Sequence, residues 1–198
     1  MDKYLLAPML IDKLGQDDNF RNYFSRFLKM LAVIGAVAAL IVFFLGWKEL
    51  FDRSAEGMIG GIVYQLTFVV AAYLVVHCTL LRAEEVKKVM PGRSAALSVS
   101  VVVLRLLGEV WGAASALLGS GAAIYVWFAG REASVLLQKA AVFFPFLKAS
   151  PASFVAGAAL IFQGFLYGAL ALLFGYLLAD LLMLLPAPSE ARQTVTAE

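Results

Sequence analysis

The chain has 198 residues, of which 62% are hydrophobic and 15% charged, and its mean hydropathy is +0.86. Soluble domains contain about 25% charged residues, so this composition is typical of an integral membrane protein. The net charge of +2, without a long basic patch, argues against a nucleic-acid partner. A single cysteine, Cys78, excludes an intrachain disulfide, and a single histidine, His77, excludes a haem held by two histidines of this chain.

The N-terminal segment 1–29 contains four aspartates, unlike the short basic start of a cleavable signal, so we expect a mature chain. Within this segment, apolar residues recur at helical spacing and predict an amphipathic helix. Its apolar face consists of Phe20, Tyr23, Phe24, Phe27 and Leu28, and its polar face of Arg21, Asn22, Ser25 and Arg26. We expect the four aromatic residues to anchor the helix in the cytoplasmic membrane interface. The alternative is a docking helix for a partner protein.

Four apolar stretches satisfy the length of roughly 20 residues that a membrane-spanning helix needs. They cover residues 30–47, 57–81, 94–129 and 152–185, and together form a predicted transmembrane domain over 30–185. The fold class is therefore all-α, with four transmembrane helices. Residues 186–198 have no apolar period and are predicted to be a disordered tail.

The third loop, from Arg131 to Ser150, is too apolar for open water, because three phenylalanines surround Pro145. A short amphipathic segment is therefore predicted in this loop. It either lies on the outer membrane surface or enters the membrane as a re-entrant segment, which requires burial in protein. The surface position is the simpler interpretation.

Lysine and arginine counts predict the orientation of the chain. The N-terminal segment, the second loop and the tail together carry ten of these residues, whereas the first and third loops carry five. Cytoplasmic segments hold the excess of basic residues, so both termini are expected in the cytoplasm.

Polar residues inside the third and fourth stretches are the candidate site. Arg105 and Asp180 lie at similar depths when both helices are counted from the outer face, and we predict an interhelical ion pair between them. We also predict an intrahelical contact from Arg105 to Glu109 and an interhelical hydrogen bond from Gln163. Three roles are open for the charged residues: structural pairing, a lone arginine reaching the headgroups, or a proton or ion path through Glu109.

Small residues at helical spacing predict faces where helices approach closely. They are Gly164, Gly168 and Gly175 in the fourth stretch, and Ser115 and Gly119 in the third. The pattern leaves open whether these faces meet within the chain or between subunits.

No catalytic, cofactor-binding or metal-binding motif is present in the sequence. We therefore expect a non-enzymatic structural or accessory subunit of a larger membrane complex, in a bacterial inner membrane. Its expected partners are membrane lipids and either other integral membrane subunits or further copies of itself. One alternative is a small homo-oligomeric channel or transporter that uses Glu109 and Arg105. Another is a membrane enzyme acting on lipid. A wet cavity beside Glu109 would favour transport, and a partner cation would favour the structural role.

Overall fold

The computed structural model describes residues 17–50, 54–88, 95–130, 133–147 and 153–184. Over these ranges the structure is helical and contains no strand. Four helices are long and apolar enough to span a membrane, which confirms the all-α membrane class. They are α2 (Asp17–Leu50), α3 (Ala55–Lys88), α4 (Ala95–Ala129) and α6 (Phe154–Met183). The predicted tail 186–198 lies outside the described residues.

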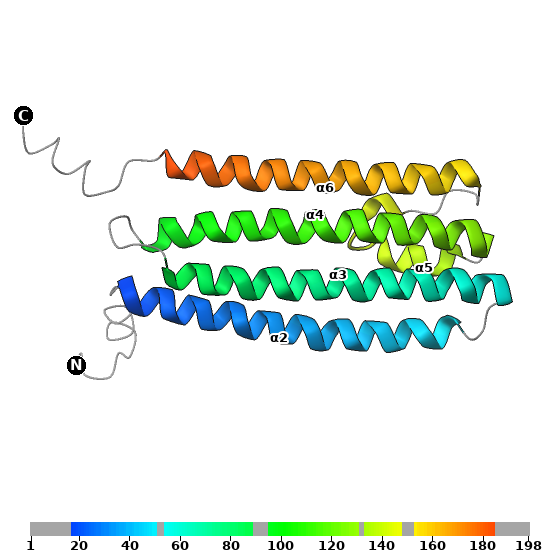
Figure 1. The fold of residues 1–198 in the computed structure, drawn as a ribbon, viewed down its shortest axis with the longest axis horizontal. Coiled ribbons are helices and arrows are strands. Elements are labelled where there is room, and N and C mark those ends of the chain that lie inside the picture. Colours follow the sequence, from blue (N-terminus) through cyan, green and yellow to red (C-terminus); the bar gives the residue numbers. More distant parts are fainter. Residues whose placement is uncertain (1–16, 51–53, 89–94, 131–132, 148–152, 185–198) are drawn as a thin grey trace, which may run out of the picture.

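The four long helices run antiparallel to their chain neighbours and stand in a row in the order of the sequence (Figure 1). α3 packs between α2 and α4, and α6 packs mainly against α4. The two outer helices, α2 and α6, consequently leave most of their apolar side chains exposed.

The predicted N-terminal amphipathic segment is helical, but it is continuous with the first membrane span. Lys29 and Met30, at the predicted boundary, have good helix propensity and do not interrupt α2. The predicted polar face is also wrong in part, because Arg21 and Ser25 are buried. The Ser25 hydroxyl donates a hydrogen bond of 2.6 Å to the Ala83 carbonyl of α3, so this face packs against the neighbouring helix.

The predicted aromatic anchor divides between two environments. Phe20 and Phe24 pack against a buried cluster between α2, α3 and α4, whereas Tyr23 and Phe27 are 54% and 55% exposed. That inner cluster consists of Leu28, Ala83, Val86, Val99, Val102 and Leu106. Tyr23 and Phe27 are therefore the more exposed members of the predicted anchor.

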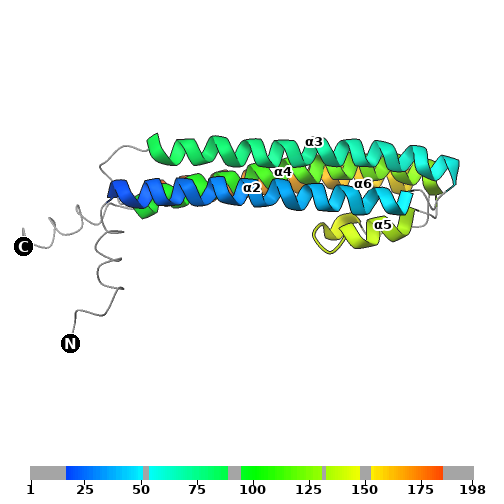
Figure 2. The same cartoon turned by 90° about the horizontal axis from the view of Figure 1, so that it is seen from below.

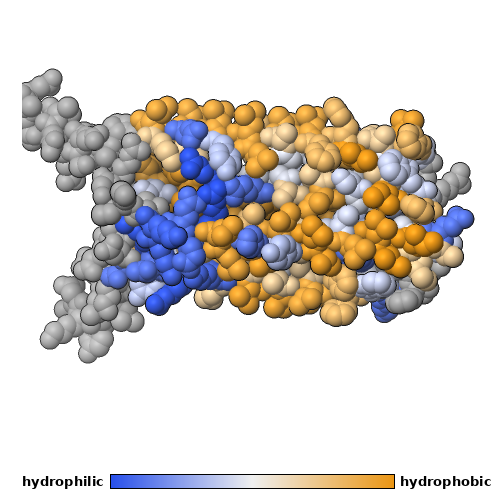
Figure 3. All heavy atoms as spheres, viewed as in Figure 1, coloured by the Kyte–Doolittle hydropathy of each residue, from blue (hydrophilic) through white to orange (hydrophobic). Residues whose placement is uncertain are grey.

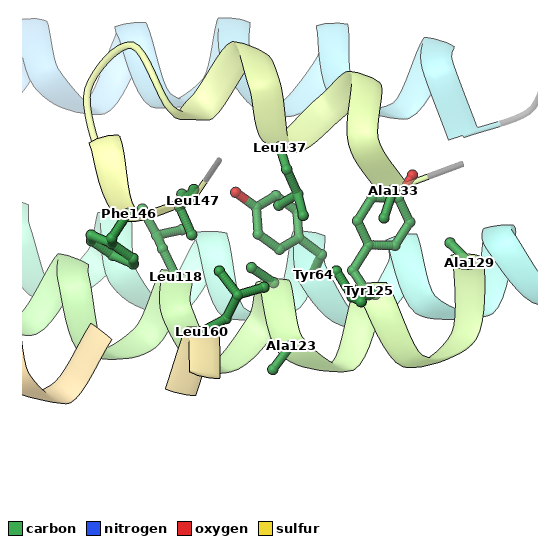
Figure 4. Packing of buried hydrophobic residues seen from close by; sticks show 12 residues of the cluster. Tyr64, Leu118, Ala123, Tyr125, Ala129, Ala133, Leu137, Phe146, Leu147 and Leu160 are labelled. Atoms are coloured by element: carbon green, nitrogen blue, oxygen red, sulfur yellow. The ribbon is translucent and has the colours of Figure 1, made fainter. Parts of the chain in front are cut away.

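The third loop forms a short helix, α5 (Ala133–Ala140), and a 3₁₀ turn, η3 (Pro145–Leu147). It turns back along the helix row after Gly130, whose positive φ of 57° favours glycine (Figure 2). Leu137 and Leu147 are fully buried in an outer cluster that also includes Tyr64, Leu118, Tyr125 and Leu160 (Figure 4). The loop therefore packs into the protein.

Two aromatic contacts show how far this loop reaches. Phe146 stacks on Tyr167 with ring centroids 5.3 Å apart, and Phe144 lies 5.2 Å from the ring of Trp111. Tyr167 lies about 20 Å along α6 from Phe154, at about 1.5 Å per residue. This depth supports the re-entrant alternative over the surface position.

Hydrogen bonds within the re-entrant segment pair several backbone amides at its tip. The amide groups of Phe143 and Phe144 both donate to the Ala140 carbonyl, and that of Leu147 donates to the Phe144 carbonyl. These bonds lower the cost of placing the segment in the membrane interior, where an unpaired N–H group is costly.

α4 and α6 approach each other along their glycines, as the small-residue pattern predicts, and this contact lies within the chain. A Cβ atom added at Gly164 would lie 2.7 Å from the Ser115 carbonyl oxygen, and one at Gly119 would lie 2.9 Å from the Gly164 Cα. Gly168 and Gly175 make equivalent contacts with Gly112 and Gly108, which the sequence analysis did not identify. Any side chain at these glycines would therefore push the two backbones apart.

Candidate functional site

Glu109 of α4 is the centre of a three-helix polar contact. The Arg82 guanidinium of α3 donates to both carboxylate oxygens, through Nε at 3.0 Å and through Nη2. The Tyr176 hydroxyl of α6 donates to the same carboxylate at 2.6 Å. The side chains of Arg82 and Glu109 are only 17% and 20% exposed, so a charge-assisted, two-pronged contact is largely withdrawn from solvent.

A second contact lies about one helical turn further toward the N-terminus of α4. Arg105 Nη2 is 3.1 Å from the Asp180 carboxylate of α6, and its guanidinium lies 5.5 Å from the centre of the Tyr176 ring. The Asp180 side chain is 66% exposed, so this ion pair is more open to solvent than that of Glu109. Arg82 Nη2 also donates to the Tyr176 hydroxyl at 3.2 Å, so Tyr176 contacts both arginines and connects the two ion pairs.

A third contact joins α2 to α3. Lys29 forms an ion pair with Glu84, and Lys87 lies 3.8 Å from the same carboxylate oxygen. Arg82 is also paired with Glu85, one turn along its own helix. We call the complete set the ion layer, which consists of Lys29, Arg82, Glu84, Glu85, Lys87, Arg105, Glu109, Tyr176 and Asp180. It links all four long helices at one level.

The position of the ion layer matches a membrane boundary. About 30 Å of helix separates Glu109 from the C-terminal end of α4, and about 33 Å separates Tyr176 from the N-terminal end of α6. Lys29 lies about 32 Å from the C-terminal end of α2. These lengths are close to the roughly 30 Å of hydrocarbon in a bilayer. Figure 3 shows the corresponding division, with hydrophilic residues gathered at one end and an apolar surface over most of the remainder.

The structure confirms one predicted pair and corrects another. Arg105 and Asp180 meet as predicted. Glu109, however, is bonded to Arg82 and Tyr176 rather than to Arg105, because its side chain points toward α3 and α6. Gln163 is half-buried on α6 and makes no side-chain hydrogen bond to another described residue, so the predicted interhelical bond is not formed there.

Arg82 is the site residue that the sequence analysis missed. Glu84, Glu85 and two lysines follow it closely, a pattern that is typical of a solvated helix end. The available signal was its position immediately after the uncharged stretch 57–81, which places it beside the level of Glu109 on an antiparallel helix.

The charged side chains of the site bind mainly to one another. In the described ranges, no three histidine, cysteine, aspartate or glutamate side chains are grouped so that they could hold a metal ion. The Glu109 carboxylate accepts three hydrogen bonds, which leaves it little capacity to act on a further molecule. Searches of protein families, curated proteins and solved structures found no match to this chain.

Proposed function

We propose that this protein is a non-enzymatic accessory subunit of a larger integral membrane complex. The observation that carries the proposal is the double contact between Glu109 and Arg82. A carboxylate that serves a proton or ion path must exchange its partners, whereas this one is held by a guanidinium and a phenol from two neighbouring helices. Its location near the bilayer boundary, rather than at the midplane, also favours a structural role.

The outer helices support the same proposal. α2 and α6 present long apolar faces, with side chains such as Ile34, Leu45, Phe165 and Leu173 more than half exposed. Such faces meet either lipid or other transmembrane helices. The chain offers these two faces for contact with membrane lipids and with other subunits or a second copy.

We further propose that both termini are cytoplasmic and that the membrane is a bacterial inner membrane. The described N-terminal end of α2 and C-terminal end of α6 share the end of the row that carries the ion layer (Figure 1). The second loop also joins helices at that end, and it belongs to the basic-rich set of segments. Cytoplasmic segments carry the excess of basic residues, so this distribution supports an orientation with both termini in the cytoplasm.

Isolation from native membranes tests the proposal. A C-terminally tagged chain is extracted in mild detergent, and the mass and composition of the purified particle are determined. Unrelated integral membrane proteins in fixed ratio with the chain are the expected result. A particle that contains only copies of this chain would contradict the accessory role and would favour the channel or transporter alternative.

A further inference from the structure

We propose that the surface formed by α2 and α3 at the ion layer binds the headgroup of an anionic phospholipid. Lys29 and Lys87 approach one carboxylate, that of Glu84, from two different helices. Two ammonium groups around one carboxylate leave a net positive charge of about one on this triad, in addition to the hydrogen-bonding capacity that each ammonium retains.

The triad is open to the surroundings. The side chains of Lys29, Glu84 and Lys87 are 39%, 49% and 37% exposed, which contrasts with the mostly buried Arg82 and Glu109. Two further basic residues, Arg26 and Lys88, are exposed within a turn of the triad on the same helices. A phosphate group can therefore approach both ammonium groups without displacing a helix.

The surface on the membrane side of the triad is apolar. Val33 lies one turn beyond Lys29 on the same face of α2, and Leu80 lies one turn before Glu84 on the same face of α3. Their exposed fractions are 61% and 38%. This surface thus places positive charge at the bilayer boundary and apolar side chains directly below it, in the order that a phospholipid needs for its phosphate and its acyl chains.

Aromatic side chains on α2 lie near the charged end of this surface. Tyr23 and Phe27 are exposed there, within two turns of Lys29. Tyrosine is enriched at the headgroup level of a membrane. A phospholipid explains the charged and the apolar parts of the surface together, whereas a free phosphate ion explains only the charged part.

Native mass spectrometry of the full chain in a neutral detergent tests this site. The probes are phosphatidylglycerol and phosphatidylcholine with the same acyl chains, supplied in equal amounts. The wild-type chain is expected to retain an excess of phosphatidylglycerol. Lys29→Gln and Lys87→Gln are each expected to lower this preference about fivefold. Lys48→Gln removes the same charge at the opposite end of α2 and is expected to leave the preference unchanged.

Glu84→Gln separates lipid binding from simple loosening of the helices. This substitution breaks the same α2–α3 ion pair as Lys29→Gln, but it removes the carboxylate that competes with phosphate. We expect a higher preference for phosphatidylglycerol in Glu84→Gln and a lower one in Lys29→Gln. A fall in both variants, or equal retention of the two lipids by the wild-type chain, would overturn the proposal. Displacement of the lipid by millimolar inorganic phosphate would identify a site for free anions and would equally overturn it.

Discussion

Arg82 and Glu109 lie on neighbouring helices and form a two-pronged ion pair, about 30 Å along α4 from its C-terminal end. The pair lies between the two buried clusters of the molecule: the inner cluster at the ends of α2, α3 and α4, and the outer cluster around the re-entrant segment. Since Tyr176 adds a contact from α6, three of the four long helices meet at a single carboxylate. The relative positions of these helices along their axes are thereby fixed.

Arg82→Gln is expected to destabilise the helix assembly by about 1.5–3 kcal/mol, because it leaves a largely buried carboxylate without its charged partner. Unfolding in mixed detergent micelles measures this loss. Asp180→Asn is the matched control: it also breaks one ion pair of the layer, but at a side chain that is 66% exposed, and is expected to cost less than about 1 kcal/mol. Equal losses in the two variants would contradict the prediction, because the buried ion pair would then contribute no more to the free energy of unfolding than the exposed one.

Gly164→Ala is expected to destabilise the contact between α4 and α6 by about 1–3 kcal/mol, because the added Cβ would overlap the Ser115 carbonyl oxygen. Gly35→Ala is the control, since nothing lies within 4 Å of a Cβ at that position of α2. Alanine is the better helix former, so the control is expected to gain up to about 1 kcal/mol. The same unfolding measurement applies, and a loss at Gly35 equal to that at Gly164 would contradict the close packing of α4 on α6.

The depth of the third loop is tested by labelling a single cysteine in a chain that also carries Cys78→Ser. Phe143 lies at the tip of the re-entrant segment, and its side chain is 72% exposed on the protein surface. On our account, this part of the surface lies within the membrane, so Phe143→Cys is surrounded by lipid. We expect a charged maleimide to leave it unlabelled from either side of a sealed membrane. Lys48→Cys, at the outer end of α2, is expected to react from the outer side. Rapid labelling of Phe143→Cys from that side would place the loop on the membrane surface instead.

The sequence predicted the spans well because hydropathy over a long window depends on composition rather than on partners. It also predicted the pair of Arg105 and Asp180, because a count of residues from the outer face needs only the helix rise. The glycines of α6 were recognisable because they recur at helical spacing, after four and then seven residues. Gly108 and Gly112 of α4 have the same four-residue spacing as Gly164 and Gly168, and they pack on α6 beside Glu109.

The remaining differences depend on tertiary contacts. Arg21 and Ser25 are polar by type, and only the position of α3 beside α2 explains their burial. The choice of Glu109 between Arg105 and Arg82 depends on which helices flank α4, which no local pattern contains. The third loop is apolar enough for either of two positions, and Phe146 selects the deeper one by its contact with Tyr167 of α6.

The most direct test of the structural role of the ion layer is a proton-flux measurement in sealed liposomes that contain the purified chain. Wild type, Glu109→Gln and the control Asp180→Asn are compared under an imposed potential, with an added protonophore to show that each preparation is sealed. We predict the same low flux in all three, equal to that of empty liposomes. A flux above that level in the wild-type chain that is lost in Glu109→Gln but kept in Asp180→Asn would contradict the account, and would identify Glu109 as part of a conducting path.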